Sequence, residues 1–250
     1  MSTIPIYVIS LKGAQERRAF MSEQLDTLGL PFRFYDAVDG RGWDVPAHLS
    51  YDKAKRRAFF GKDLSGGEMG CLLSHRAIYE KMLREGTPEV LVLEDDAILH
   101  ADLPKVLGAL ERMGEPYDLI RFLGSDKVAK LEQKIVAPIT GQYTLNRLCT
   151  TPGGAHAYII TQAGAQKLLK HMQRNFLPVD TLMGHVWMTG IKGYIVQPGL
   201  AVHDLARESF IGDARFDKKG AGVKPWYYPL SRALFKAYEG IAKRVSYVFS

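Results

Sequence analysis

One acidic segment constrains the fold of this chain more than any other feature. Residues 90–93 (VLVL) form an apolar run suited to a buried strand, and the carboxylates of Glu94, Asp95 and Asp96 follow it directly. Burying unpaired carboxylates is costly, so such a cluster must lie at the surface, be paired, or hold a cation. Ligands of α/β sheets bind at the carboxyl ends of strands. The segment therefore predicts a core strand that ends at a ligand site, with a solvated strand end as the alternative.

Strand-like and helix-like segments alternate along the chain. Helical spacing of apolar residues predicts helices over 14–28, 65–86 and 163–172, and a short one that begins near Asp180. Ser65 and Glu68 have the spacing of a capping box. Strands are predicted over residues 4–11, 32–35, 90–93, 117–123, 154–161 and 194–196, with an irregular or helical basic region over 43–63. The alternation predicts a three-layer α/β fold, and its irregular middle favours a mixed central sheet.

The C-terminal part of the chain has a different character. Residues 206–224 are polar and glycine-rich, which predicts a mobile loop, and the last segment is helical. One face of that helix is apolar, formed by Leu230, Leu234, Ala237, Ile241, Val245 and Val248. We expect a main domain over 1–211, and a loop with a basic amphipathic helix over 212–250. Such a helix suits the headgroup layer of an anionic membrane, or else docking on its own domain or in a dimer interface.

Charge and cysteine content exclude some classes of protein. The net charge of +6 comes from 33 basic and 27 acidic residues, which suits an anionic partner but shows no concentrated stripe for nucleic acid. Two cysteines are too few for a disulfide framework or a thiolate metal site, which favours a reducing cytoplasm. No run approaches the ~18 apolar residues of a spanning helix. We expect a cytoplasmic protein, which its last helix could bring to the inner face of the membrane.

The acidic segment predicts a site for a hard divalent cation. Mg²⁺ or Mn²⁺ takes one or two carboxylates together with substrate phosphates. In an extended segment Glu94 and Asp96 point one way and Asp95 the other, so one carboxylate could face a ribose and another the metal. Asp96 is the expected metal ligand. The neutral imidazole of His203 could complete the coordination of Mn²⁺, although a lone histidine is more often structural.

Two helix starts provide further candidates. Glycines around Gly67 would let backbone amides approach an anion at a helix N-terminus, and Ser74 and His75 on the same helix could reach the cleft. Asp180 starts a short helix, where its carboxylate could cap free amides or act as a general base. A capped helix with a buried histidine is the simpler alternative for the first of these.

In order along the chain, these segments resemble glycosyltransferase family 25, the lipopolysaccharide and lipooligosaccharide galactosyltransferase group that includes collagen galactosyltransferases. The resemblance rests on residues 6–11 with Arg17 and Arg18, residues 34–40, 67–75 and 92–96, residues 154–161 with Gly164 and Ala165, and residues 178–180. It covers residues 4–211. Lys12 departs from the family, which commonly has asparagine there, and residues after 212 have no counterpart.

The resemblance implies a bacterial nucleotide-sugar transferase with a GT-A-type fold that inverts the anomeric centre. The usual donor is UDP-galactose, and the acceptor a lipooligosaccharide or lipopolysaccharide glycan or glycolipid. The implied donor contacts are Ser10, Leu11, Arg17, Arg18, Asp36, Gly67, Ser74, His75, Glu94 and Asp95. Asp96 and His203 would hold Mn²⁺ or Mg²⁺, which supplies positive charge to the leaving diphosphate. The base expected beside the acceptor hydroxyl is Asp180, with Asp118 and Asp126 as rivals.

Two other classes remain compatible with the residues. A nucleotidyltransferase would share acidic metal ligands and a helix terminus, but it would release pyrophosphate instead of UDP. A non-catalytic basic binding protein would explain the charge and the basic segments 53–57 and 218–219, but not the acidic strand end. The acceptor sugar, the linkage and the oligomeric state are left open, and an oligomer is compatible with the sequence.

Overall fold

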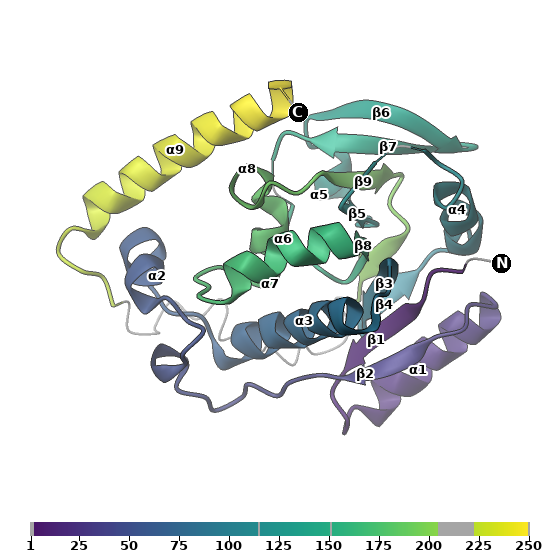
Figure 1. Cartoon of the computed structure of the whole chain (residues 1–250), viewed down its shortest axis with the longest axis horizontal. Helices are drawn as coiled ribbons and strands as arrows, with labels where there is room; N and C mark the ends of the chain where they lie inside the picture. Colours follow the sequence, from purple (N-terminus) through teal and green to yellow (C-terminus); the bar gives the residue numbers. More distant parts are fainter. Residues whose placement is uncertain (1–2, 115, 151, 205–222, 250) are drawn as a thin grey trace.

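A mixed β-sheet organises the part of the chain that the computed structural model describes, residues 3–114, 116–150, 152–204 and 223–249. Its strands are β1 (Ile6–Ser10), β2 (Arg33–Asp36), β3 (Glu89–Glu94), β5 (Leu119–Arg121), β6 (Gln133–Thr140), β7 (Tyr143–Leu148), β8 (Ala157–Thr161) and β9 (Gly193–Gln197). They are arranged in the order β2-β1-β3-β8-β5-β9-β7-β6 (Figure 1). A small second sheet pairs β4 (Ala97–Leu99) with β10 (Ala201–His203).

The strand directions bring several chain segments to one edge of the sheet. β1 runs parallel to β2 and β3, so these three strands end at the same edge. β8 runs antiparallel to β3, which places the residues before β8 at that edge as well. The Glu94 N–H donates to the His156 carbonyl over 2.9 Å there. The predicted mixed sheet is confirmed. The irregular middle of the chain contains the β6–β7 hairpin, at one edge of the sheet, which sequence patterning did not predict.

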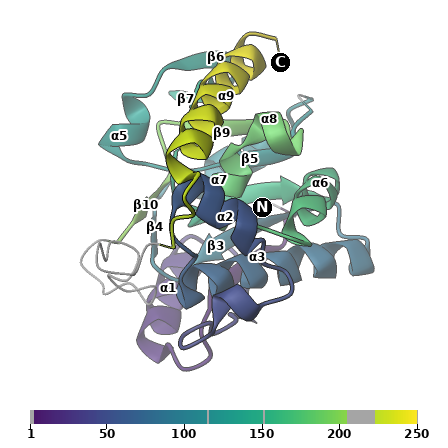
Figure 2. The same ribbon diagram turned by 90° about the vertical axis from the view of Figure 1, so that its left-hand side faces the viewer.

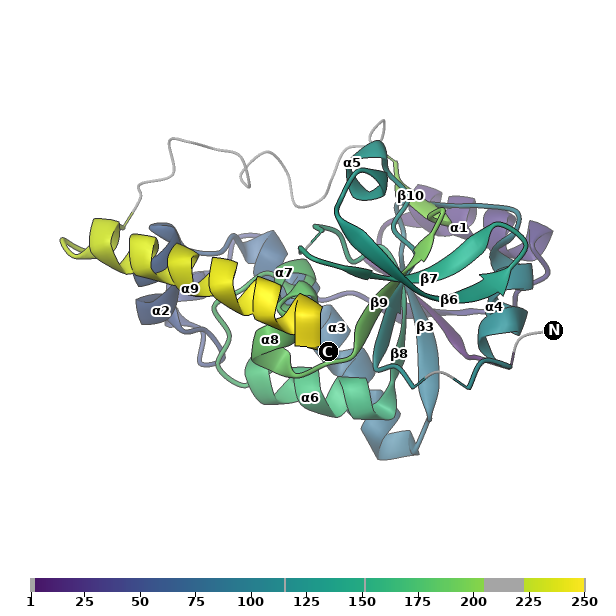
Figure 3. The ribbon, with the colours of Figure 1, turned by 90° about the horizontal axis from the view of Figure 1, so that it is seen from above.

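Helices cover both faces of the sheet (Figure 3). One face packs against α1 (Gln15–Thr27) and α4 (Leu103–Leu110). The other packs against α3 (Gly66–Glu85), α6 (Gln162–Met172) and α7 (Val179–Gly184). Each face of the sheet has its own hydrophobic core, and alternate residues of β3 pack into the two. Leu91 and Leu93 lie in the core on the first face, and Val90 and Val92 in the core on the second. This period of two, buried on both sides, confirms the predicted three-layer fold.

The start of α3 is fixed by its cap and by close backbone packing. The Glu68 N–H donates to Ser65 Oγ over 3.1 Å, and the Ser65 N–H donates to Glu68 Oε2 over 2.8 Å, so the predicted capping box is present. One turn later, a Cβ on Gly70 would lie 2.5 Å from the Val38 carbonyl oxygen. Only glycine therefore lets the loop after β2 pack directly on the first turns of α3.

The C-terminal helix α9 (Tyr228–Phe249) docks across α2 (Lys53–Phe60) and α8 (Val186–Thr189) (Figure 2). The Phe235 ring stacks on Phe59 at 4.5 Å between centroids, and Ser231 Oγ donates to the Ala58 carbonyl over 2.6 Å. The predicted loop over 206–224 falls almost entirely outside the described residues, as does the boundary between 211 and 212. Among the described residues, no helix has the length and apolarity needed to cross a membrane.

Gly70→Ala is expected to destabilise the fold by about 1–3 kcal/mol, because the added methyl overlaps the Val38 carbonyl. The matched control is Gly240→Ala in α9, where nothing lies within 4 Å of the added Cβ. Alanine in an exposed helix interior usually stabilises by up to about 1 kcal/mol relative to glycine. Urea unfolding of both variants measures the difference. A Gly70→Ala protein as stable as Gly240→Ala would contradict the packing argument.

Acid is expected to weaken the fold through His185, which is buried beneath α9 with Nε2 3.1 Å from Glu239 Oε1. Burial lowers the pKa of His185 to about 4, against about 6.5 for an unfolded chain. The unfolded state therefore binds the extra proton first. The stability due to neutral His185 is complete above pH ~6.5 and is lost as the pH falls towards 4, by at most about 3 kcal/mol.

The measurement is the free energy of unfolding between pH 7 and 4.5. His185→Gln should flatten this pH dependence, whatever it does to the stability at pH 7. His100→Gln, at an exposed histidine, should leave the dependence as in the wild type. Equal slopes for the wild type and His185→Gln would show that His185 does not contribute.

Candidate functional site

A cavity of about 190 Å³ opens at the edge of the sheet where β1 and β3 end. Its other walls come from the loop after β2, the start of α3, the residues before β8 and the start of α7. Most predicted site residues line it: Ser10, Leu11, Arg17, Gly67, Ser74, Glu94, Asp95, Asp96, Asp180 and His203. It also exposes residues that the sequence did not single out as site residues, namely Asp39, Arg41, Glu68, Cys71 and His156.

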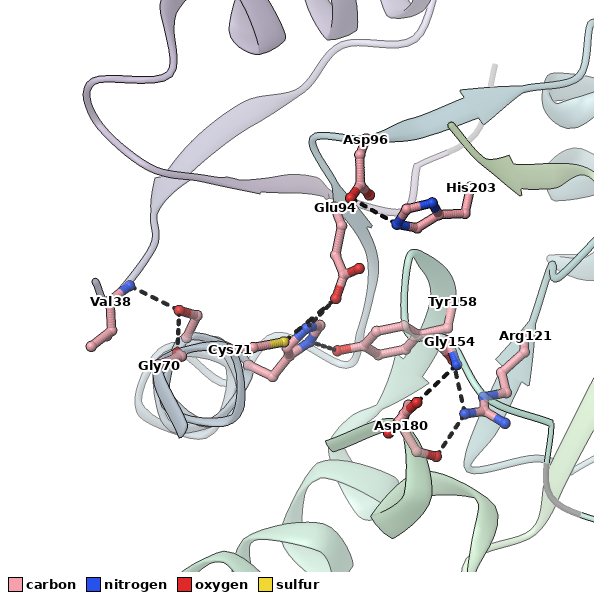
Figure 4. A network of polar contacts seen from close by, with 12 residues as sticks. Val38, Gly70, Cys71, Glu94, Asp96, Arg121, Gly154, Tyr158, Asp180 and His203 are labelled. Carbon is pink, nitrogen blue, oxygen red and sulfur yellow. Dashed lines mark hydrogen bonds and ion pairs between the residues drawn. The ribbon is translucent and has the colours of Figure 1, made fainter. Parts of the chain in front are cut away.

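The three adjacent carboxylates reach three different partners. β3 ends at Glu94, residues 95 and 96 form a turn, and β4 begins at Ala97. Glu94 lies towards α3 and Asp96 towards β10 (Figure 4). Asp95 is bound by Arg17 of α1. The prediction that strand alternation extends through Asp96 and groups it with Glu94 is wrong, because the chain leaves the extended conformation after Glu94.

Glu94 is held by a buried chain of hydrogen bonds. His75 Nε2 lies 3.1 Å from Glu94 Oε1, His75 Nδ1 lies 2.6 Å from the Tyr158 hydroxyl, and that hydroxyl lies 2.8 Å from the Tyr79 hydroxyl. An ionised Glu94 can only accept, which requires a proton on His75 Nε2, and a neutral His75 then accepts from the Tyr158 hydroxyl at Nδ1. His75 is fully buried and is not part of the cavity lining. It therefore fixes Glu94 from behind instead of reaching the cleft.

Cys71 adds a third potential ligand beside this pair. Its Sγ lies 3.6 Å from Glu94 Oε1, and ligand atoms of Cys71, His75 and Glu94 lie within 4.8 Å of one another. Burial, reinforced by the charge of Glu94, raises the pKa of the Cys71 thiol well above its usual value. A neutral thiol that donates to a carboxylate accounts for this geometry, and a thiol is a poor ligand for Mg²⁺ or Mn²⁺.

Arg17 neutralises the acidic turn from the side of α1. Its NH1 lies 2.9 Å from Asp95 Oδ1 and 3.8 Å from Asp96 Oδ2. Burial raises the pKa of Asp95, and the hydrogen bond from Arg17 opposes that shift. Arg17 lines the cavity while it forms these contacts. A guanidinium in this place can hold the carboxylates in position and still present positive charge to a bound anion.

Arg18 and Asp36 do not line the cavity. They form an ion pair with each other, and Arg18 donates to the main-chain carbonyls of Ser10 and Leu11 over 3.1 and 3.2 Å. The Arg18 guanidinium also lies 4.9 Å above the Phe34 ring. The pair therefore fastens the ends of β1 and β2 together. Direct donor contacts from these two side chains find no support in the structure.

Asp96 and His203 form the candidate metal centre. Asp96 Oδ2 lies 3.0 Å from His203 Nε2. Burial is the largest influence on the pKa of Asp96 and raises it, but the hydrogen bond from His203 together with the nearby charges of His203 and Arg17 gives a net downward shift. The same hydrogen bond raises the pKa of His203. Asp96 Oδ1 and His203 Nδ1 are buried and have no hydrogen-bond partner among the described residues. One unpartnered carboxylate oxygen beside an imidazole fits Mn²⁺ better than Mg²⁺.

His156 stands beside this pair and was missed from the sequence. Its ring centroid lies 6.2 Å from that of His203, and its Nε2 lies 3.1 Å from the Ala201 carbonyl. Burial lowers the pKa of His156, so the imidazole is neutral at physiological pH. No sequence pattern around His156 marks it as a site residue. It reaches the site because β8, which follows it, pairs with β3, a strand far from it in the sequence.

Asp180 lies in the first turn of α7 and faces the cavity. Its Oδ2 accepts from the Gly154 N–H over 3.0 Å and its Oδ1 from the Thr181 N–H over 2.7 Å. Buried Arg121 donates to the main-chain carbonyls of Asp180 and Gly154 over 2.8 and 3.0 Å. This arrangement fixes the carboxylate at the wall of the cavity. Asp180 lies in the first turn of α7 and not at its N-cap, which is Pro178, but its carboxylate does accept from the free Thr181 amide.

Asp118, one of the two rival carboxylates, has other surroundings. Asp118 precedes β5 and binds Lys167 Nζ and the Lys192 N–H over 2.6 and 2.7 Å, and it is not part of the cavity lining. Asp118 therefore forms a structural ion pair with Lys167, at the end of β5 that points away from the cavity. Asp126 begins the short helix α5 (Asp126–Ala129).

Ser74 and the glycines of α3 hold the loop after β2 in place. Ser74 Oγ donates to the Gly70 carbonyl over 2.7 Å and accepts from the Val38 N–H over 2.8 Å. Ser74 is fully buried in these contacts. The loop in turn presents Asp39 and Arg41, which pair with each other, to the cavity. Ser74 thus shapes the wall, and Gly67 lines the cavity at the N-terminus of the helix.

Comparison with known proteins gives a consistent result. Residues 3–183 match the family described as Glycosyltransferase family 25 (LPS biosynthesis protein). A Bos taurus protein named probable inactive glycosyltransferase 25 family member 3 is 29% identical over 243 positions, covering 88% of this chain and 39% of its own length. The lipooligosaccharide biosynthesis protein lic2B of Haemophilus influenzae is 27% identical over 207 positions, covering 79% of this chain and 75% of its own length.

Among solved structures, a glycosyltransferase involved in the glycosylation of the major capsid of PBCV-1 superposes with a TM-score of 0.46 and 8% identity. The match covers 82% of this chain and 94% of that one. The chain spans about two fifths of the length of the mammalian relatives that it matches.

Proposed function

The chain belongs to glycosyltransferase family 25, and from that premise we propose that it is a metal-dependent inverting transferase that moves galactose from UDP-galactose to a lipooligosaccharide or lipopolysaccharide glycan. The observation that carries the proposal is the cavity, where Asp96 presents an unpartnered buried oxygen and Asp180 a fixed carboxylate. The relative lic2B, named for lipooligosaccharide biosynthesis, supports the class of acceptor. The donor sugar and the inversion rest on the family resemblance.

The donor diphosphate would lie between the N-terminus of α3 and the acidic turn. Asp96 and His203 would hold the divalent ion, which when bound stabilises the negative charge of the departing diphosphate. The backbone at Gly67 lies at the positive end of the α3 dipole, which favours an anion there. Arg17 keeps Asp95 and Asp96 in place and adds positive charge. Glu94, fixed by His75, is left to bind hydroxyl groups of the donor.

Asp180 would act as the general base. In a single displacement the acceptor hydroxyl oxygen forms a bond to the anomeric carbon, the bond from that carbon to the diphosphate oxygen breaks, and the hydroxyl proton passes to Asp180. Hydrogen bonds from the Gly154 and Thr181 amides hold the carboxylate in one orientation, which favours a proton transfer in fixed geometry. The Thr181 hydroxyl also donates to Asp180 Oδ1 over 3.2 Å.

The test is a donor screen with Mn²⁺ and a panel of UDP-sugars, read as UDP release with and without lipooligosaccharide acceptors. We expect UDP-galactose to give acceptor-dependent UDP release and a galactosylated product. Another UDP-sugar as the preferred donor would correct the donor alone. Release of pyrophosphate from UTP and a sugar phosphate would show a nucleotidyltransferase instead, and the absence of turnover with every donor would refute the proposal.

A further inference from the structure

Helix α9 presents two faces of different character. Its inner face packs on the domain through Ser231, Phe235 and Glu239. Its outer face carries large apolar side chains at spacings of three and four residues, each 51–66% exposed: Leu230, Leu234, Tyr238, Ile241, Val245 and Val248. The apolar stripe predicted from the sequence is thus present, but the helix docks through a different face and leaves the stripe in solvent.

The charges of α9 are arranged with the same asymmetry. Glu239 is the only acidic residue of the helix, and it faces inward, 3.1 Å from His185 and 3.7 Å from Lys243. Arg244 is exposed beside the stripe, three residues after Ile241 and four before Val248, and Lys236 is exposed on another side of the helix. The outer surface of the helix therefore combines an apolar stripe with positive charge and carries no carboxylate of its own.

Aromatic residues stand at the start of this surface. Trp226 is 92% exposed, and Tyr227 beside it is also exposed. Amphipathic aromatic side chains favour the boundary between apolar and aqueous regions. Over residues 230–248 the stripe extends about 27 Å at ~1.5 Å per residue, which is long enough for a helix lying flat on a surface.

We propose that the outer face of α9, together with Trp226 and Tyr227, is a membrane-binding face for a bilayer that contains anionic lipids. An exposed arginine beside an apolar stripe, on a surface of the helix without a carboxylate, matches anionic headgroups above acyl chains. A second copy of this chain is a poorer occupant, because its own α9 would bring a second arginine close to Arg244 with no carboxylate to pair with. None of the stripe residues lines the cavity, so the inference concerns a surface separate from the proposed chemistry.

Vesicle flotation of the full chain tests this inference. Wild-type protein should float with vesicles of phosphatidylcholine and phosphatidylglycerol, and much less with phosphatidylcholine alone. Leu234→Glu/Ile241→Glu should lower the floated fraction at least tenfold. The matched control is Leu49→Glu/Ile135→Glu, which adds the same charge at exposed apolar residues outside α9 and should lower binding far less. Lys236→Glu/Arg244→Glu, which keeps the stripe, should remove the preference for anionic vesicles.

Three results would overturn the inference. One is a wild-type protein that does not float. Another is equal flotation of the stripe variant and the control, when thermal unfolding curves show that both proteins are folded. The third is a stripe variant that converts a dimer to a monomer in light scattering while vesicle binding stays unchanged, which would assign the face to a second copy. UDP release with a soluble acceptor is measured in parallel, so a failure of the membrane face is distinguishable from a failure of the proposed activity.

Discussion

Asp180→Asn is expected to lower kcat by about 10²–10⁴-fold, the usual effect of removing a general base, while the affinity for UDP stays within about twofold. Asparagine keeps a side-chain oxygen that can accept from the Gly154 or Thr181 amide, so the start of α7 should remain ordered. The substitution removes the basic oxygen and little else. The measurement is single-turnover kinetics together with calorimetric binding of UDP in Mn²⁺.

Glu94→Gln is the matched comparison for Asp180, because Glu94 also lines the cavity and also accepts hydrogen bonds from fixed donors. If Asp180 is the base, Glu94→Gln should act mainly on donor affinity. A large fall in kcat for Glu94→Gln with near-normal turnover for Asp180→Asn would transfer the role to Glu94. The proton could then be shared along the His75 and Tyr158 hydrogen bonds behind it.

Asp96→Ala should abolish the Mn²⁺-dependent part of the affinity for UDP, a loss of roughly 100-fold or more. The physical reason is that Asp96 Oδ1 is the unpartnered buried carboxylate oxygen of the cavity among the described residues, so it has lone pairs to give to a cation. Calorimetric titration of UDP with Mn²⁺ and with EDTA measures the effect. The wild type should bind more weakly in EDTA, and the variant equally in both.

Asp39→Ala is the control, since it also removes one carboxylate from the cavity wall but one that is paired with Arg41. Its Mn²⁺ dependence should stay intact. An unchanged Mn²⁺ dependence in Asp96→Ala would refute the assignment of Asp96. If Cys71→Ser abolished the dependence instead, the cation would belong to the cluster of Cys71, His75 and Glu94.

Local patterns were sufficient for much of the fold. The apolar run before Glu94 became β3, and the Ser65–Glu68 spacing became the capping box of α3. The β6–β7 hairpin was not predicted, because it lies at the edge of the sheet with mostly half-exposed residues, contains Pro138 and has register shifts. Such a strand shows neither a continuous apolar run nor clean alternation.

The site was predictable in membership but not in roles. Sequence reasoning placed Glu94, Asp96 and Asp180 at one site, and the cavity brings them together. It also predicted that Arg18 contacts the sugar donor, whereas in the structure Arg18 links the ends of β1 and β2. His156 escaped notice, because nothing near it in the chain marks it as a neighbour of His203.

The sequence by itself determined that a buried strand ends in three carboxylates beside a capped helix, because strand periodicity and capping depend on residues close together in the chain. Only the tertiary structure decided where each carboxylate points. Their partners are distant in sequence: Arg17 lies 78 residues from Asp95, and His75 lies 19 residues from Glu94. The same holds for α9, whose apolar stripe is local pattern but whose exposure depends on α2 and α8, which dock its other face.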